Sequence, residues 1–187
     1  MEGYLGIDQS LTGTGLALVD ANGAYVRSTT VSVGKLKGSP RLQHIVDAYN
    51  KFTEGFNVRG AASEGYSVHS TNRPFDLGGV AWVLRLRTFQ AFGIEPADIP
   101  PASLKLYATG SGAADKELVL YTVKTAWGVD LGDRDNEADA LALARFAHTI
   151  GTGQFSRRCE IEAHHSLFPG TAKASKARAG RPKSPNV

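Results

Sequence analysis

The first 33 residues show the short apolar runs and alternation that predict strands. Residues 4–8 (YLGID) form an apolar run that ends in an acid, which is typical of a buried strand. Residues 13–20 and 24–33 follow, with Asn22 and Gly23 between them as turn residues. These three segments predict an antiparallel meander.

Further along the chain, apolar residues recur at helical spacing. Ser39 is suited to cap the first of these helices, and Pro40 fits its first turn. Residues 61–66 are a weaker strand candidate. Residues 95–105 contain three prolines, so we expect them to be extended or turning, with a further strand among them. Helices are expected over residues 39–52, 75–92, 115–127 and 136–150.

The order of these elements predicts the fold class. Three strands come first, and the later strands then alternate with helices. This order favours an α/β fold in which a mixed sheet, made of an antiparallel meander and parallel strands, is flanked by helices. We expect one domain over residues 1–155, a C-terminal extension over residues 156–170, and a basic, disordered tail over residues 171–187.

Composition limits the cellular setting. The chain has no apolar run long enough to span a membrane and no signal-peptide pattern at its start, so no membrane partner is expected. The single cysteine, Cys159, cannot form an internal disulfide, which fits a reducing compartment. These features predict a cytoplasmic protein.

The net charge of +3 hides an uneven distribution. Residues 171–187 carry five basic residues and no acid, so the rest of the chain has a slight excess of acids. Such a tail would add salt-sensitive affinity for nucleic acid, although basic tails commonly serve as tethers.

Three acids lie where separate elements could direct them to one place. Asp8 ends the first strand, Glu64 lies in the fourth, and Asp139 lies one turn inside the last predicted helix. Clustered carboxylates raise each other's pKa, and a divalent cation offsets that repulsion. The alternative is that each acid only caps an element or faces solvent.

Three motifs in order resemble those of the RuvC-type Holliday junction resolvases, which belong to the ribonuclease H-like superfamily. The first is GIDQSLTGTGLALVD at residues 6–20, a strand, an Asp, a polar loop and a returning strand. The second is SLKLYATGSGAADKELV at 103–119, and the third is DNEADALALA at 135–144. Together the motifs span about three quarters of the chain, and they imply a ribonuclease H-like nuclease in a bacterial cell or a phage-infected host.

The resemblance implies a site with two magnesium ions, for which manganese should substitute. Asp8, Glu64 and Asp139 would hold the ions. The family usually has Asp or His three residues before its last Asp, where this chain has Asn136. Asn136 or the neighbouring Asp135 would supply the fourth ligand, and Asp135 could instead be an N-cap.

The same resemblance implies contacts with DNA. Lys116 would lie near the scissile phosphate, and Lys105 would contact the backbone or stabilise charge that builds there. The hydroxyls of the turn after Asp8 could bind phosphates, and an aromatic residue could stack at the junction centre. The candidates for these contacts are Ser10, Thr12, Thr14, Tyr66, His69, Arg73 and Phe75.

The implied function is hydrolysis of branched DNA by a magnesium-dependent endonuclease, with paired nicks in four-way junctions. One alternative is a broader nuclease for flaps and forks. Others are an inactive DNA-binding module and an actin- or sugar-kinase-like ATPase, whose phosphate loop the first motif also resembles.

Symmetric cutting needs a homodimer, and we expect the helix face with Val80, Val83 and Leu84 to form it. Four other residues with chemically versatile side chains are expected to have only structural roles. His164 and His165 lack further ligands at metal spacing and are expected at the surface, while Trp82 and Trp127 are expected in the core.

Overall fold

The computed structural model describes residues 1–65 and 74–169. The strands are β1 (Glu2–Asp8), β2 (Gly13–Asp20), β3 (Tyr25–Ser32), β4 (Asn57–Glu64) and β5 (Ala97–Ile99). The helices are α1 (Gly38–Thr53), α2 (Pro74–Phe92), α3 (Pro101–Thr109), α4 (Lys116–Ala126), α5 (Asp135–Thr152) and α6 (Arg158–Leu167). The expected tail over 171–187 and the residues 66–73 lie outside this description.

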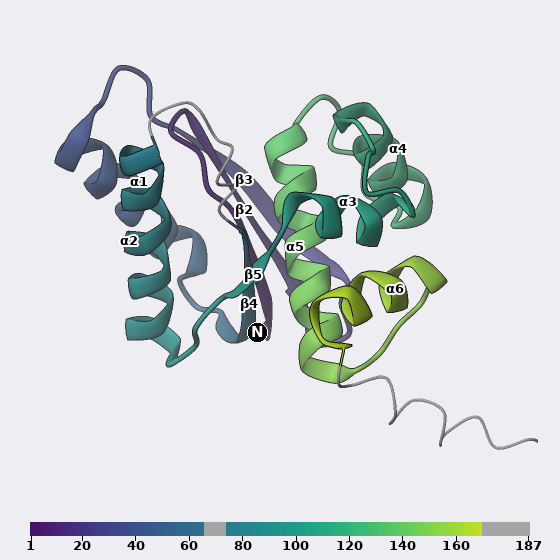
Figure 1. Cartoon of the computed structure of the whole chain (residues 1–187). Helices are drawn as coiled ribbons and strands as arrows, with labels where there is room; N and C mark the ends of the chain where they lie inside the picture. Colours follow the sequence, from purple (N-terminus) through teal and green to yellow (C-terminus); the bar gives the residue numbers. More distant parts are fainter. Residues whose placement is uncertain (66–73, 170–187) are drawn as a thin grey trace, which may run out of the picture.

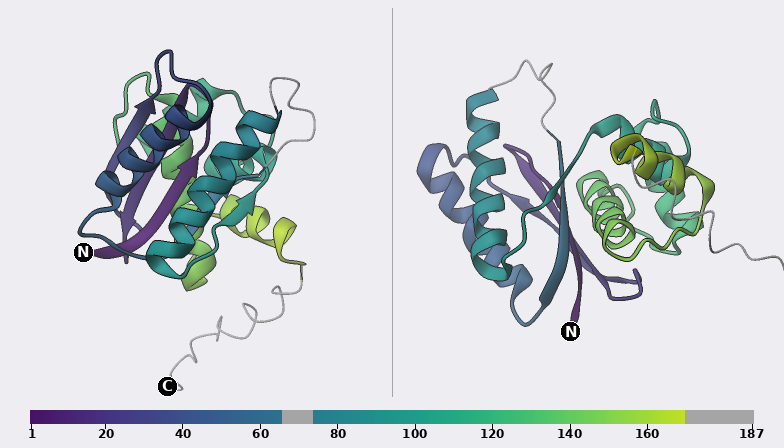
Figure 2. Two further views of the ribbon diagram at one scale, coloured as in Figure 1. Left: turned by 90° about the vertical axis from the view of Figure 1, so that its left-hand side faces the viewer. Right: turned by 60° about the horizontal axis from the view of Figure 1, so that its bottom comes forward.

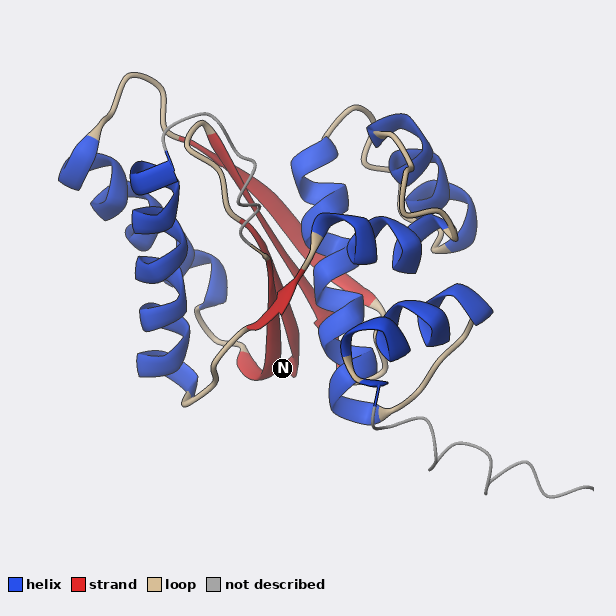
Figure 3. Cartoon of the chain, in the orientation of Figure 1, coloured by secondary structure: helices blue, strands red, loops and turns tan. Residues whose placement is uncertain are grey.

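The strands form one mixed sheet in the order β3-β2-β1-β4-β5 (Figure 3). The meander β1-β2-β3 is antiparallel, whereas β4 and β5 join it by parallel pairing. The expected fold class is therefore confirmed. Strand β4 begins four residues earlier than the expected segment 61–66, and it lies directly beside β1.

Helices cover both faces of the sheet, so the fold has three layers (Figures 1 and 2). Alternation along β1 divides its side chains between two cores. Leu5 and Ile7 pack with α1 and α2, while Tyr4 packs with the helices of the other layer, α3 to α6. Asp8 lies on the same side as Tyr4, because it is an even number of residues away.

Helix α5 lies unusually close to the sheet because two glycines face it. A Cβ atom at Gly6 would lie 1.9 Å from the backbone oxygen of Ala140. A Cβ atom at Gly15 would lie 2.1 Å from the backbone oxygen of Asn136. The first turns of α5 are therefore held against the ends of β1 and β2, where no side chain fits between them.

Two helices form where the sequence pattern predicted none. The expectation that residues 95–105 are all extended or turning was wrong in its second half, because Pro101 occupies the first helical position of α3, where a missing N–H costs nothing. Helix α6 forms after residue 157, where the periodicity fades. It packs on α3, and Ala163 and Glu160 on it are buried.

The expectations for α2 also need correction. Val80 and Leu84 are fully buried against this chain's own core, so they cannot form a face for a second molecule. Trp82, expected in the core, is 70% exposed. Helix α2 carries apolar residues all round, and periodicity therefore does not say which side faces inward.

The two histidines of α6 and the second tryptophan are all only partly exposed. Trp127 is half-buried and packs at the edge of the core. His164 and His165 are half-buried, and His164 contacts the rings of Phe155 and Phe168, so it is not a simple surface residue. None of the helices in the described stretches has the length and apolarity needed to cross a bilayer.

The close approach of α5 predicts an unequal response to two glycine substitutions. Gly6→Ala should lower the free energy of unfolding by roughly 3 kcal/mol or more, because the clashing atoms are backbone and α5 must move. A Cβ atom at Gly78 in α2 would have open space around it, so Gly78→Ala should raise the free energy of unfolding by up to about 1 kcal/mol. Urea denaturation followed by circular dichroism measures both; equal stability of Gly6→Ala and wild type would contradict the packing.

Candidate active site

Asp8 stands at the end of the central strand β1, and its side chain is buried. Strands β2 and β4 pair with β1 on its two sides, so the backbone around Asp8 is held by both neighbours. An acid at this position makes no capping contact with a helix. The strand instead fixes its direction toward the layer that contains α5.

Glu64 ends the parallel strand β4 and lies beside Asp8. The register pairs Ile7 with Ser63, so the next residues along the two strands are neighbours. Their carboxyl groups share a hydrogen bond. The side-chain amide of Gln9 donates a hydrogen bond to the backbone oxygen of Glu64, which joins the two strand ends.

Asp139 reaches the same place from α5. Asn136 and Asp139 are one turn apart on the helix face that approaches the sheet. The glycine-mediated contact at Gly15 brings the backbone of Asn136 against β2, and this places the first turns of α5 over the end of β1. The three carboxylates expected to converge are thus delivered by three different elements.

These residues line a cavity of about 580 Å³ between the end of the sheet and the helices α2, α3, α4 and α5. The cavity contains the three acids, both expected lysines and several residues of the turn after β1. Its lining is Asp8, Gln9, Ser10, Leu11, Thr12, Glu64, Leu77, Pro101, Lys105, Lys116, Val119, Asn136 and Asp139.

The three carboxyl groups perturb one another. Burial, followed by the charges of Glu64 and Asp139, raises the pKa of Asp8 well above its ordinary value. Burial and the charge of Glu64 raise the pKa of Asp139 to about 6. Burial also raises the pKa of Glu64, while its hydrogen bond with Asp8 and the two nearby lysines act in the opposite direction. The site therefore resists carrying three negative charges at once.

Lys116 begins α4, where Asp115 caps the helix by accepting a hydrogen bond from the backbone N–H of Leu118. Its ammonium group pairs with the carboxylate of Asp135 at 2.5 Å. This contact raises the pKa of Lys116 and lowers that of Asp135. Asp135 is thus turned toward the lysine and does not line the cavity, whereas Asn136 does.

Lys105 enters the cavity from α3. Pro101 and Lys105 are one turn apart and both line the cavity, while Leu104, Tyr107 and Ala108 on the other side of the helix are buried in the core. The charge of Lys105 lowers the pKa values of Glu64 and Asp139. It is therefore close enough to act on the same anionic centre.

The chemistry of the donors fits a hard divalent cation. Asp8 is buried and Glu64 and Asp139 are half-buried, and the repulsion among the three carboxylates is relieved by a dication with oxygen ligands. The Oε1 atom of Gln9 is also buried and has no hydrogen-bond partner among the described residues. Within residues 1–65 and 74–169, however, no three His, Cys, Asp or Glu side chains stand in a closed ligand arrangement. The carboxylates converge on the cavity without forming a finished cage.

The turn after Asp8 brings hydroxyl groups to the rim. Ser10 and Thr12 line the cavity, and the Ser10 hydroxyl accepts a hydrogen bond of 3.2 Å from the backbone N–H of Thr12. Thr14 is fully buried, and its hydroxyl donates to the backbone oxygen of Ser10 at 3.1 Å. Thr14 therefore shapes the turn and does not face a ligand.

The expected aromatic and basic contacts with DNA are only partly visible. Tyr66, His69 and Arg73 lie outside the described residues. Phe75, at the start of α2, is 92% exposed and lies apart from the cavity.

Sequence reasoning missed five residues of the cavity, namely Gln9, Leu11, Leu77, Pro101 and Val119. Gln9 directly follows Asp8, and that position at a strand end was the signal that could have drawn attention to it. Leu77 and Val119 give the cavity its apolar wall. No chemical signal distinguishes them from core residues.

Comparisons with known proteins agree with the motifs. A family model described as crossover junction endodeoxyribonuclease RuvC matches residues 4–148. The RuvC protein of Halorhodospira halophila (strain DSM 244 / SL1) is 30% identical over 183 residues, which are 95% of this chain and 99% of the relative. The RuvC protein of Prochlorococcus marinus (strain MIT 9303) is 26% identical over 160 residues, which are 82% of this chain and 98% of the relative.

A solved structure supports the fold. The chain resembles T. thermophilus RuvC in complex with a Holliday junction substrate, with a TM-score of 0.63 and 22% identity over 80% of this chain and 94% of that one. The ribonuclease H-like fold and the resemblance drawn from the three motifs are therefore confirmed.

The raised carboxyl pKa values predict how stability depends on pH. Asp139 has a pKa of about 6 when folded and 3.8 ordinarily, so the folded chain keeps a proton that the unfolded chain releases. The contribution of this proton to the free energy of unfolding of the metal-free protein is fully present below about pH 4 and is lost as pH rises from there to about 6. Asp139→Asn should remove part of this loss of stability with rising pH. It should therefore raise the Tm at pH 8 in EDTA by about 3–8 °C.

Thermal melts between pH 4 and 8, with and without EDTA, measure this effect. Asp47→Asn, at an exposed position of α1, is the matched control and should not alter the pH profile. A Tm for Asp139→Asn at or below that of wild type at pH 8 would show that the carboxylates do not repel one another.

Proposed function

The chain belongs to the RuvC family of crossover junction endodeoxyribonucleases, and we propose that it cuts four-way DNA junctions by hydrolysis at the cavity described above. The observation that carries the proposal is the convergence of Asp8, Glu64 and Asp139 on one cavity that also contains two lysines. Family membership favours this activity over the ATPase alternative. The near-complete set of acids and lysines argues against an inactive binding module.

Asp8, Glu64 and Asp139 are the residues that would hold divalent ions, which would be magnesium, with manganese as a substitute. Asn136 is the better fourth ligand because it lines the cavity, while Asp135 is engaged by Lys116. When bound, a pair of such ions activates a water molecule and stabilises the leaving oxygen. The carboxylates must be ionised to bind them, so activity should rise as pH increases through about 6.

The lysines act on the phosphate. Negative charge builds on the phosphate oxygens as water attacks, and fixed cations at that point lower the barrier. Lys116 keeps its proton because Asp135 lies beside it, and Lys105 faces the carboxylates from the opposite helix. Ser10 and Thr12, at the cavity rim, would orient the DNA backbone through their hydroxyls.

The branched structure of the substrate follows from the family. The relatives are named for crossover junctions, and the T. thermophilus protein was solved with a Holliday junction substrate. Tyr66, from the sequence resemblance, is the candidate for stacking on an unpaired base, because we assign exposed Phe75 to the contact surface described next. Activity on flaps and forks is the alternative that a substrate panel distinguishes.

Paired nicks require two active sites, and the outer face of α2 is suited to join them. Phe75, Trp82 and Phe89 recur every seven residues on this helix, and Leu86 lies among them. All four are exposed large apolar side chains, a pattern that marks a contact surface. We therefore assign the homodimer contact to this stripe, in place of the buried face with Val80 and Leu84.

The first test is cleavage of a labelled four-way junction in magnesium, with linear duplex, flap and fork controls. Asp8→Asn should cut roughly 10³-fold or more slowly, because losing a metal ligand costs several kcal/mol of transition-state stabilisation, yet it should still bind. Manganese should support cleavage, and calcium should support binding without it. Asp47→Asn is the control expected to cut like wild type.

If flaps were cut as fast as four-way junctions, the protein would be a broader structure-specific nuclease and not a resolvase. An absence of metal-dependent cleavage on every substrate would contradict the proposed activity.

The second test concerns the dimer. Phe89→Asp should shift the protein from dimer to monomer in analytical ultracentrifugation, because a charge is buried at the apolar stripe. Paired nicks in one binding event should then give way to single nicks. Tyr121→Asp, at an exposed aromatic of α4, is the control that should stay dimeric. A wild-type protein that is monomeric on its junction would contradict this assignment.

A further inference from the structure

Helix α3 is short, and one of its ends is held from outside. It carries Lys105 into the cavity, and its last carbonyl groups point away from the site toward α6. The carbonyls at the end of a helix have no partner within it, so they need one elsewhere. Gly110 supplies one backbone N–H, to the oxygen of Leu106, and the next two carbonyls are left for side chains.

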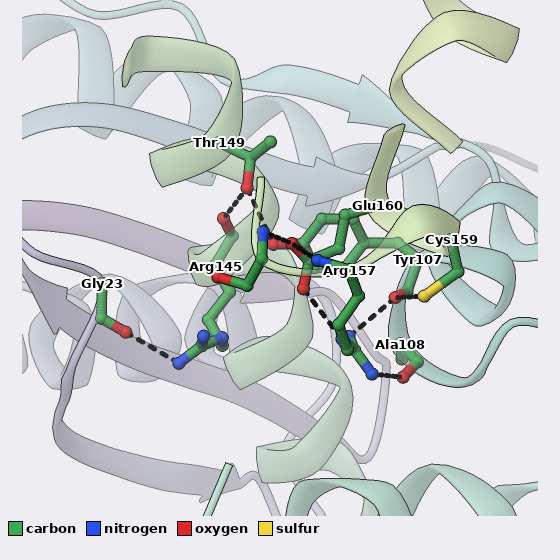
Figure 4. Close-up of polar contacts among 9 residues, drawn as sticks. Gly23, Tyr107, Ala108, Arg145, Thr149, Arg157, Cys159 and Glu160 are labelled. Carbon is green, nitrogen blue, oxygen red and sulfur yellow. Dashed lines mark hydrogen bonds and ion pairs between the residues drawn. The ribbon is translucent and has the colours of Figure 1, made fainter. Parts of the chain in front are cut away.

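Arg157, directly before α6, takes both of these carbonyls (Figure 4). Its Nη1 donates to the oxygen of Ala108 at 2.8 Å, and its Nη2 donates to the oxygen of Tyr107 at 2.9 Å. The thiol of Cys159 adds a weaker contact to the oxygen of Tyr107 at 3.5 Å. A planar guanidinium suits this fork, because its donors have fixed directions.

Arg157 is itself fixed by a buried acid. Its Nε donates to Glu160 at 2.9 Å, and Glu160 is 1% exposed. The second carboxylate oxygen of Glu160 accepts the backbone N–H groups of Ser156 at 2.7 Å and of Arg157 at 3.2 Å. The guanidinium therefore cannot move away without leaving a buried carboxylate that has no cation beside its Oε1 atom.

The same cluster reaches the other helices that supply the site. The Tyr107 ring stacks on Phe146 of α5, with ring centroids 4.3 Å apart. The hydroxyl of Tyr107 lies 2.8 Å from that of Thr149, which is also on α5. The guanidinium of Arg157 lies over the ring of Trp127, which ends α4, at 5.3 Å. Helices α3, α4 and α5 are thus joined behind the cavity that they line.

We propose that Arg157 is a positioning residue for Lys105, acting by capping the end of α3. Lys105 is two residues before Tyr107, so a shift of the last turn moves its ammonium group relative to the carboxylates. Displacement of a catalytic cation by about 1 Å costs up to about 10²-fold in rate. Arg157 lies past the family match, which ends at residue 148. The positioning role deepens the proposed nuclease function and rests on it.

Arg157→Gln tests this directly, with Arg158→Gln as the matched control. Arg158 is the next residue, is 91% exposed and pairs only with Glu162 among the described ion pairs. Single-turnover cleavage at saturating junction should slow about ten-fold in Arg157→Gln and stay unchanged in Arg158→Gln. The Kd for the junction in calcium should stay within about two-fold in both variants, because the DNA surface is unchanged.

A double-mutant cycle with Lys105→Ala separates positioning from general loosening. If Arg157 acts through Lys105, adding Arg157→Gln to Lys105→Ala should slow cleavage by no more than about two-fold. The proposal would be overturned if the rate losses of the two single variants multiplied in the double variant. It would also be overturned if Arg157→Gln cleaved as fast as wild type. If Arg157→Gln does not fold, Arg157→Lys replaces it, since a lysine keeps the charge beside Glu160 but cannot bridge both carbonyls.

Hydrogen exchange supplies a readout that does not depend on cleavage. Amides of α3 should exchange faster in Arg157→Gln than in Arg158→Gln, and unchanged exchange would overturn the capping role. Wild-type protein that cuts no junction would overturn the proposed function instead. The two failures are therefore distinguishable.

Discussion

The contact between α5 and the strands β1 and β2 is the constraint on which the rest of the structure depends. Gly6 and Gly15 leave no room for a side chain, so the helix backbone packs directly on the sheet. This depth of packing sets where the first turns of α5 lie, and with them Asn136 and Asp139. A helix held at an ordinary distance by larger side chains would leave Asp139 short of Asp8 and Glu64.

The packing of α5 on the sheet holds together carboxyl groups that would otherwise separate because they repel one another. One buried and two half-buried carboxyl groups have raised pKa values, and the folded protein must hold them together against their repulsion. The surrounding elements compensate through rigid supports: paired strands, a capped α4 and the ion pair of Lys116 with Asp135. The gathering of these carboxyl groups lowers stability at the site that function needs, a trade-off that is common in enzymes.

Much of the fold and site could be predicted from sequence because the signals were local. Asp8 lies at the end of an apolar strand, and Asp139 lies near the start of a strongly periodic helix. The structure places both residues at these predicted positions. Helix α3 was missed because a pair of prolines disfavours helix before them, yet Pro101 is well suited to begin one. Helix α6 was missed because its docking depends on the distant partners of Arg157, not on its own periodicity. Trp82 was wrongly expected in the core because α2 has apolar residues on all sides, and the sequence does not show which side packs on the sheet.

The parallel pairing of β1 with β4 has a consequence for the order in which the protein matures. The rest of the meander and α1 lie between Asp8 and Glu64 along the chain, so the two acids become neighbours only when β4 pairs with β1. Such non-local pairing forms slowly, because a long loop must close first. Asp139 leaves the ribosome last of the three acids. A nascent chain therefore has no complete set of carboxylates, and the ability to cut DNA arises only in the finished domain.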